Sequence, residues 1–265
     1  MRIVILGSGS APRTATGADT SCRGITALGT GDGRWVLINV SAAVAQQLSG
    51  EPEFLLPHPE LFDAAAVRAV VLTDAQIEHV GGLLGLRGGA GIDLYATPAV
   101  FEDLTTTLPV LPVLQHYCGV HWHVVPVAGD TRAASFRVEG MPTLEFTALA
   151  TQMPAPPHSA HHQQPVVGDT IALAVRDLAT GQRVFCAPGL TRIGAQEFDW
   201  MREADCLLVD DLAREPKPTD PDWLDLLSGL PARHKVLFAD ADRTERDSLA
   251  ARGLQLAYHG LEIEL

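Results

Sequence analysis

At residues 70–82 the sequence reads Val70-Val71-Leu72-Thr73-Asp74-Ala75-Gln76-Ile77-Glu78-His79-Val80-Gly81-Gly82. The apolar run at 69–72 contains the β-branched Val70 and Val71 and is too short for a helix, which predicts a strand covered on both faces. Four groups that can bind a metal or a proton follow within six residues, namely Asp74, Gln76, Glu78 and His79. Because α/β folds place their chemistry at the carboxyl ends of buried strands, we expect a functional site here.

The composition limits the class of protein. The 265 residues allow one large domain or two small ones, and an apolar fraction of 46% supports a sizeable core. A net charge of −13 argues against nucleic acid and against anionic membrane surfaces as partners. No apolar stretch reaches transmembrane length, and the opening apolar run is too short for a signal-peptide core. We therefore predict a cytoplasmic protein.

The four cysteines are scattered along the chain, at Cys22, Cys118, Cys186 and Cys206. No two are close enough in sequence for a zinc site of the C-x-x-C type. Their spacing is typical of reduced thiols in a cytosolic protein.

Strands and helices alternate on both sides of the opening stretch. The patterns predict strands at 2–6, 21–30, 34–40, 67–72, 92–96, 136–139, 144–148, 170–176, 183–190 and 204–211. Helices are predicted at 42–48 after Ser41 as N-cap, at 81–87, at 98–104 after Thr97 as N-cap, and at 194–203.

Residues 72–87 resemble the metal loop of the metallo-β-lactamase superfamily, T-H-x-H-x-D-H-x-G-G. They are closer to one branch, the coenzyme PQQ synthesis protein B family, whose loop is similar to L-T-D-A-E-I-D-H-x-x-G-L-L-x-L-R. Three further stretches of this chain are similar to family patterns. Residues 35–41 resemble the family's W-L-L-I-N-A-S, residues 95–98 its Y-A-T-P, and residues 168–190 its G-D-N-I-G-L…A-P-G-L. The resemblance covers nearly the whole chain and is weakest in the N-terminal loop and at 211–250.

This resemblance implies a single domain over 1–265 with an α/β fold, a four-layer αββα sandwich of the metallo-β-lactamase type. It places the metal ligands at Asp74, Glu78, His79 and Asp210, and the catalytic groups at Asp74, Glu78 and His79. Gln76 is a weak oxygen donor, and His158 stands where the family often has Tyr beside its substrate cavity. Gln76 and His158 are therefore the predicted substrate-binding residues. We expect the site at the edge where the loops 7–22, 73–79, 153–164 and 210–216 converge.

The chain also departs from the family pattern. The N-terminal loop has only Cys22 where the family carries a C-x-C-x-x-C knuckle, so we expect no structural zinc. No His stands at the family's last ligand position, and His259 replaces an Asp near the end. A set of carboxylates with one His suits Fe(II), Mn or Mg better than zinc, and the resemblance implies Fe(II). A second His ligand would have to come from His158 or His259.

Three functions follow from these residues. The resemblance implies an iron-dependent hydroxylase acting on a tyrosine-containing precursor of PQQ (pyrroloquinoline quinone). The second is a non-catalytic carrier or transport-related protein for PQQ or its precursor. The third is a metal-dependent hydrolase such as a phosphodiesterase, which the loss of the first two His positions disfavours. Alternatively, Asp74, Glu78 and His79 only tie the strand end to the helix.

The expected partners are the precursor and other PQQ biosynthesis proteins, and homodimer formation is left open.

Two further groups of histidines stand apart from the opening stretch. His121 and His123 alternate on one face of a predicted strand, and we interpret them as exposed strand residues rather than ligands. His158, His161 and His162 lie in a Pro-rich loop, where exposed positions tolerate His.

Overall fold

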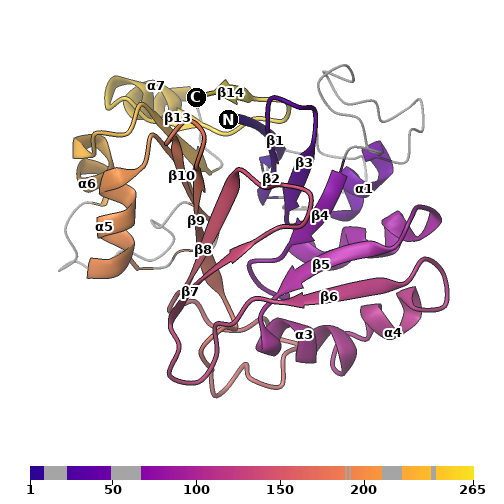
Figure 1. Ribbon diagram of the computed structural model, residues 1–265. Helices are drawn as coiled ribbons and strands as arrows, with labels where there is room; N and C mark the ends of the chain where they lie inside the picture. The colour runs from indigo at the N-terminus through magenta and orange to yellow at the C-terminus, as the bar shows by residue number, and fades with distance from the viewer. Residues whose placement is uncertain (9–22, 49–66, 189, 191, 211–222, 240–242) are drawn as a thin grey trace.

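A computed structural model describes residues 1–8, 23–48, 67–188, 190, 192–210, 223–239 and 243–265. Two seven-stranded sheets pack against each other, and helices cover their outer faces (Figure 1). The two ends of the chain lie close together because the first strand pairs with the last. The predicted four-layer αββα arrangement is therefore confirmed.

The first sheet holds the opening stretch near its middle, with the strand order β14-β1-β2-β3-β4-β5-β6. Pairing is antiparallel from β14 to β3 and parallel from β3 to β6. Its strands are β1 (Arg2–Ser8), β2 (Arg23–Gly29), β3 (Trp35–Ile38), β4 (Val67–Val71), β5 (Ile92–Ala96), β6 (Val120–Val124) and β14 (Glu262–Glu264).

The second sheet repeats this arrangement, with the order β13-β12-β11-β10-β9-β8-β7. Pairing is antiparallel from β7 to β10 and parallel from β10 to β13. Its strands are β7 (Ala133–Arg137), β8 (Leu144–Ala150), β9 (Ile171–Asp177), β10 (Arg183–Ala187), β11 (Cys206–Asp210), β12 (His234–Phe238) and β13 (Gln255–Leu256).

The helices divide between the two outer faces, as Figure 1 shows. Beside the first sheet lie α1 (Ala42–Leu48), α2 (Ile77–Val80), the 3₁₀ helix η3 (Gly81–Gly88), α3 (Pro98–Thr105) and α4 (Val110–Leu114). Beside the second lie α5 (Ala195–Glu203), α6 (Trp223–Gly229) and α7 (Arg243–Ala251). Within the described residues, none of these helices combines the length and apolar character needed to cross a membrane.

Local sequence signals set two of the helix starts. The Thr97 hydroxyl accepts a hydrogen bond from the amide of Val100, and Pro98 occupies the first turn of α3, as predicted. The hydroxyl of Ser41 accepts in the same way from the amide of Val44 in α1. The predicted helix at 81–87 is instead a 3₁₀ helix that continues from the short α2.

Within this 3₁₀ helix, Gly82 packs closely on the start of α1. A Cβ at Gly82 would lie 2.3 Å from the carbonyl oxygen of Ser41.

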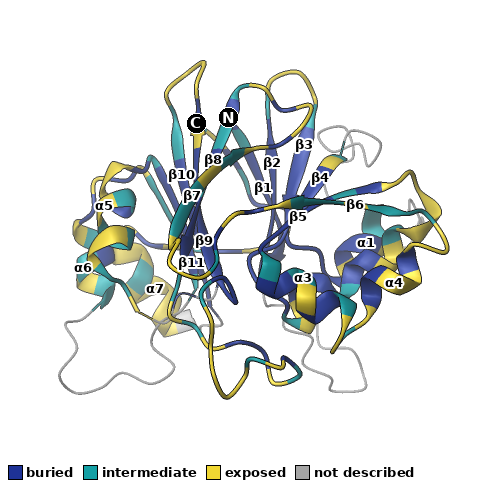
Figure 2. Ribbon diagram, turned by 60° about the horizontal axis from the view of Figure 1, so that its bottom comes forward, coloured by how far each residue is buried: buried dark blue, intermediate teal, exposed yellow. Residues whose placement is uncertain are grey.

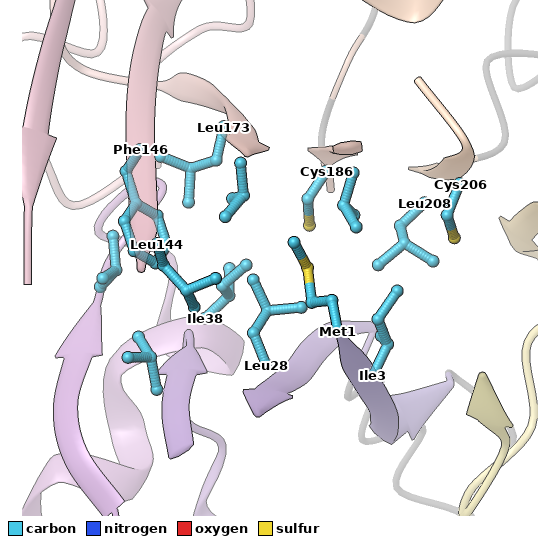
Figure 3. Close-up of a cluster of buried hydrophobic side chains, with 14 of the residues drawn as sticks. Met1, Ile3, Leu28, Ile38, Leu144, Phe146, Leu173, Cys186, Cys206 and Leu208 are labelled. Carbon is cyan, nitrogen blue, oxygen red and sulfur yellow. The ribbon is translucent and has the colours of Figure 1, made fainter. Parts of the chain in front are cut away.

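Three apolar layers hold the sandwich together. The central layer joins inward-facing residues of both sheets, and Figure 3 shows Leu28 and Ile38 of the first sheet facing Leu173 and Leu208 of the second. Two outer layers join each sheet to its helices. Figure 2 shows the result, with dark blue strands inside and helices whose outer surfaces are yellow. Buried apolar area, the main favourable term in folding, is thus shared among three interfaces.

The central layer also contains two cysteines, one on β10 and one on β11. Burial raises the pKa of the Cys186 thiol to about 12, and burial raises the pKa of Cys206 as well. Because the thiolate is the reactive form, we expect iodoacetamide at neutral pH to alkylate the partly exposed Cys118 and to leave Cys186 and Cys206 unmodified. Peptide mass spectrometry measures each site separately, and labelling of Cys186 as fast as Cys118 in the folded chain would contradict this packing. Cys22 lies outside the described residues.

Candidate functional site

The centre of the candidate site is a buried hydrogen-bonded pair, Asp74 and His79. β4 ends at Val71, and the chain then turns through Thr73 and Asp74 into α2, which carries His79. The Nδ1 atom of His79 lies 2.8 Å from both carboxylate oxygens of Asp74. The Asp74 side chain is fully buried, and only 8% of the His79 side chain is exposed. Because a carboxylate only accepts hydrogen bonds, Nδ1 of His79 must carry the proton.

Both oxygens of Asp74 are occupied by donors. Besides His79, one oxygen accepts from the amide of Gln76 at 2.9 Å, and the other accepts from the hydroxyl of Thr73 at 3.0 Å. An imidazole held in this way by a carboxylate has a defined ring orientation and a defined tautomer. The arrangement therefore suits Asp74 to orienting the His79 ring.

The second ring nitrogen of His79 points to the junction between the two sheets. A Cβ built on Gly24, at the start of β2, would lie 3.5 Å from Nε2 of His79 and 2.2 Å from Cβ of Pro188. Pro188 follows β10 of the second sheet. A side chain at Gly24, whose φ is +72°, would overlap Pro188. The glycine therefore lets the second sheet approach the His79 ring.

The other two polar residues of the loop face elsewhere. Glu78 is exposed, although it adjoins the buried His79. Gln76 is half-buried, and its side-chain amide donates to the sulfur of Met153 at 3.8 Å. Gln76 therefore borders the loop that connects β8 to β9, where the predicted substrate cavity lies.

Asp210 stands at the carboxyl end of β11 and is half-buried. Ala187 and Val209 are direct neighbours on the parallel strands β10 and β11, so Asp210 lies beside Pro188 in the next position. Pro188 in turn packs on Gly24, beside the His79 ring. The structure thus brings Asp210 to the same edge of the sandwich as His79.

The loop between β8 and β9 is anchored next to this edge. The amide of Ile171 donates to the carbonyl of Thr73 at 2.8 Å, which ties β9 to the carboxyl end of β4. His158 in this loop is half-buried, and its Nε2 is buried with no hydrogen-bond partner among the described residues. An imidazole nitrogen in that position is suited to contact a bound molecule, and a substrate role for His158 stays a prediction.

His161 and His162 hold the loop itself. Nδ1 of His161 lies 3.0 Å from a carboxylate oxygen of Asp169, and burial raises the pKa of Asp169 above its ordinary value. The other Asp169 oxygen accepts from the amide of Val166 at 2.7 Å. Nδ1 of His162 donates to the carbonyl of Ala155 at 2.8 Å. These two histidines have local partners, so they order the loop.

His121, His123 and His259 have partners other than Asp74. Both His121 and His123 on β6 approach the carboxylate of Asp93, at 3.5 and 2.9 Å. His121 is exposed, as predicted, whereas His123 is half-buried and stacks on Tyr95 with 4.4 Å between ring centroids. The expectation of an exposed His123 was therefore wrong, because the larger Tyr95 ring covers it. Nδ1 of His259 donates to the carbonyl of Leu6 at 2.9 Å.

The predicted ligands do not form a metal centre by themselves. In the part of the chain that the structure describes, no three His, Cys, Asp or Glu side chains are grouped so that they could hold a metal ion. Asp74 is occupied by hydrogen-bond donors and Glu78 is exposed. A metal role for the four predicted ligands stays a prediction. The predicted loops at 9–22 and 211–216 lie outside the described residues.

Sequence reasoning missed two buried residues of the site, Asn39 and Thr73. The side-chain amide of Asn39 and the hydroxyl and backbone amide of Thr73 form a buried cluster that leads to Asp74. One sequence signal could have pointed to Asn39, because it matches the Asn of the family pattern W-L-L-I-N-A-S. Its hydrogen-bond partner Thr73, however, is 34 residues away in sequence.

Comparison with known proteins agrees with this geometry. A family model described as a β-lactamase superfamily domain matches residues 34–238. Coenzyme PQQ synthesis protein B of Methylobacillus flagellatus is 37% identical over 262 residues, which cover 87% of this chain and 84% of the relative. The protein of the same name from Azotobacter vinelandii is 35% identical over 268 residues, which cover 90% and 86%.

A solved structure shows the same fold. The crystal structure of Zn²⁺-bound PqqB from Methylobacterium extorquens superposes with a TM-score of 0.71 at 21% identity, over 100% of both chains. The metallo-β-lactamase-like fold predicted from residues 72–87 is thereby confirmed. From the sequence matches together with this fold, it follows that the chain belongs to the coenzyme PQQ synthesis protein B family of the metallo-β-lactamase superfamily, a family of PQQ biosynthesis proteins.

Proposed function

We propose that this protein binds a tyrosine-containing precursor of PQQ at the edge formed by His79, Asp210 and the loop between β8 and β9, and that it serves the hydroxylation of that precursor. The observation that carries the proposal is the Asp74–His79 pair, whose Nδ1 contact fixes the ring so that Nε2 faces the junction of the two sheets. A phenol ring offers both an O–H donor and an oxygen acceptor to such a nitrogen.

The surroundings of His79 suit an aromatic substrate. Gln76 and Met153 lie together beside the site, and the buried Nε2 of His158 belongs to the same loop as Met153. Thioethers make favourable contacts with aromatic rings, and imidazole and amide groups fix polar substituents. We propose that these residues receive the tyrosine-derived part of the precursor.

Iron-dependent hydroxylation is the chemistry that the family resemblance favours, and Fe(II) is the metal that we propose for it. The described residues fit this metal only in part. His79 and Asp210 are the residues at this edge that would hold it, but no group of three is assembled in the described part of the chain, so we derive no step through iron. The zinc bound by the Methylobacterium extorquens protein is a property of that protein; for this chain, zinc is the competing metal in the test below.

A non-catalytic carrier of PQQ or its precursor is the second candidate, and one observation favours it. Asp74, which stands at the first ligand position of the superfamily loop, uses both oxygens for internal hydrogen bonds. A site ordered in this way without a metal can still bind and hand over a ligand. In either role we propose that the protein works with other proteins of PQQ biosynthesis.

Metal analysis of the purified protein distinguishes the two candidates. For the hydroxylase we expect about one equivalent of iron, lost in His79→Ala and in Asp210→Ala, and a gain of one oxygen atom in a tyrosine-containing precursor peptide. The exposed carboxylate of Asp199 provides the control, because Asp199→Ala should retain the metal.

The other outcomes decide against hydroxylation or against the whole proposal. A metal-free protein that binds the precursor or PQQ in calorimetric titration identifies the carrier. A protein that takes up zinc in place of iron and does not hydroxylate the peptide also excludes the hydroxylase. A protein that binds neither compound, with or without added metal, contradicts the proposed function.

A further inference from the structure

Asn39 has an unusual backbone for its residue type. Among the described residues it is the only one other than glycine with a positive φ, at 61°, and it is fully buried. This left-handed conformation is unfavourable for residues with a Cβ, and Asn tolerates it better than most. Such a conformation persists where the surrounding contacts enforce it, and it is often found at functional sites.

The turn at Asn39 holds the backbone of His79. β3 and β4 pair up to Ile38 and Val71, and the amide of Asn39 extends this pairing to the carbonyl of Val71 at 2.9 Å. The chain then turns, and the amide of Val40 donates to the carbonyl of His79 at 2.7 Å. The unusual φ of Asn39 therefore directs the next amide onto the residue at the centre of the site.

The Asn39 side chain reaches the same histidine by a second route. Its Oδ1 accepts from the amide of Thr73 at 3.0 Å, and its Nδ2 donates to the hydroxyl of Thr73 at 2.9 Å. The Thr73 hydroxyl lies 3.2 Å from Oδ1 of Asn39 and 3.0 Å from Oδ2 of Asp74. It has only one proton, and a carboxylate is the stronger acceptor, so the proton points to Asp74.

The donors thus run in one direction, from the Asn39 amide through the Thr73 hydroxyl to the Asp74 carboxylate, which holds Nδ1–H of His79. We propose that Asn39 and Thr73 are positioning residues, which set the orientation and tautomer of His79 and thereby the direction in which Nε2 faces. This inference rests on the proposed function for the identity of the bound molecule. The hydrogen-bond relay itself is independent of it.

Thr73 offers a matched pair of variants. Thr73→Val keeps the shape of the side chain but removes the hydroxyl, whereas Thr73→Ser keeps the hydroxyl. Asn39→Gly gives a second route, because glycine adopts the positive φ freely and only the side-chain clamp is lost. These three variants and the wild type are prepared as full-length chains with ¹⁵N-labelled histidine, and His79→Gln identifies the His79 ring signals.

Ring-nitrogen NMR at about pH 8 reports directly which ring nitrogen of His79 carries the proton. We expect the Nδ1–H form alone in the wild type and in Thr73→Ser, and a mixture of tautomers in Thr73→Val and Asn39→Gly. The affinity for the precursor is expected to fall about tenfold in Thr73→Val and Asn39→Gly, because each loses one buried hydrogen bond that supports a charged group.

Identical His79 ring signals in the wild type, Thr73→Val and Asn39→Gly would overturn the relay. If Thr73→Val does not fold, the comparison of Asn39→Gly with the wild type decides the question. If the ring signals change as expected but the wild type binds no precursor, the relay stands and the proposed function fails.

Discussion

Replacing His79 with glutamine is expected to lower the rate of precursor conversion, or the affinity for the precursor if the protein is a carrier, by at least about 100-fold. Glutamine fills similar space, but its amide cannot present a basic nitrogen at the position of Nε2. Asp74 also loses the Nδ1–H donor that it now receives at 2.8 Å, so its buried carboxylate is left with two donors, from Thr73 and Gln76. Product formation by mass spectrometry and titration calorimetry measure the two quantities.

His116 supplies the control for this experiment, because it is exposed and lies just after α4, in a different segment from the loop that carries Asp74 and His79. We expect His116→Gln to match the wild type in conversion and binding. Circular dichroism of His79→Gln must show a folded chain. Wild-type conversion and affinity in folded His79→Gln would exclude His79 from the site.

Gly24→Ala is expected to destabilise the fold by about 3 kcal/mol, and to disturb the site as well. About 1 kcal/mol comes from placing a Cβ at a positive φ, and about 2 kcal/mol comes from overpacking against Pro188, whose Cβ would lie 2.2 Å from the new atom. The strain falls between the two sheets, beside Nε2 of His79. The free energy of unfolding in urea measures the loss.

Gly33 provides a control that separates the cost of the positive φ from the cost of overpacking. Its φ of +78° is similar to that of Gly24, but a Cβ there would meet no atom within 4 Å. Gly33→Ala should therefore cost only about 1 kcal/mol and leave precursor binding unchanged. Equal losses in Gly24→Ala and Gly33→Ala would show that the sheets do not need the close approach at Gly24.

Much of the fold follows from short-range patterns in the sequence. The apolar residues 69–71 become the buried end of β4, and Thr97-Pro98 starts α3 as a cap and first-turn proline. Both effects depend on residues within a turn of each other, so the sequence predicts them without knowledge of the rest of the chain. The Asp74–His79 spacing belongs to the same class, because one turn after the strand brings the two side chains together.

The roles of neighbouring residues in that loop depended on more than spacing. Glu78 and His79 are adjacent on α2, yet Glu78 is exposed and His79 is buried, because successive side chains on a helix point about 100° apart. The sequence pattern offered both as ligands. Only the packing of α2 on the sheet decided which one turns inward.

The sequence alone identified the family, because the loop at 72–87 resembles that family's loop, and the resemblance implied the four-layer arrangement. It also predicted a candidate site after β4, from polar residues that follow a buried strand. Tertiary structure decided what surrounds His79. Asn39 meets Thr73 from 34 residues away, and Gly24 meets Pro188 across the two sheets. Such contacts depend on strand order and sheet packing, which bring together residues that no local pattern connects. The carboxylate of Asp74 accepts from His79 in this setting, and its predicted role as a metal ligand stays a prediction.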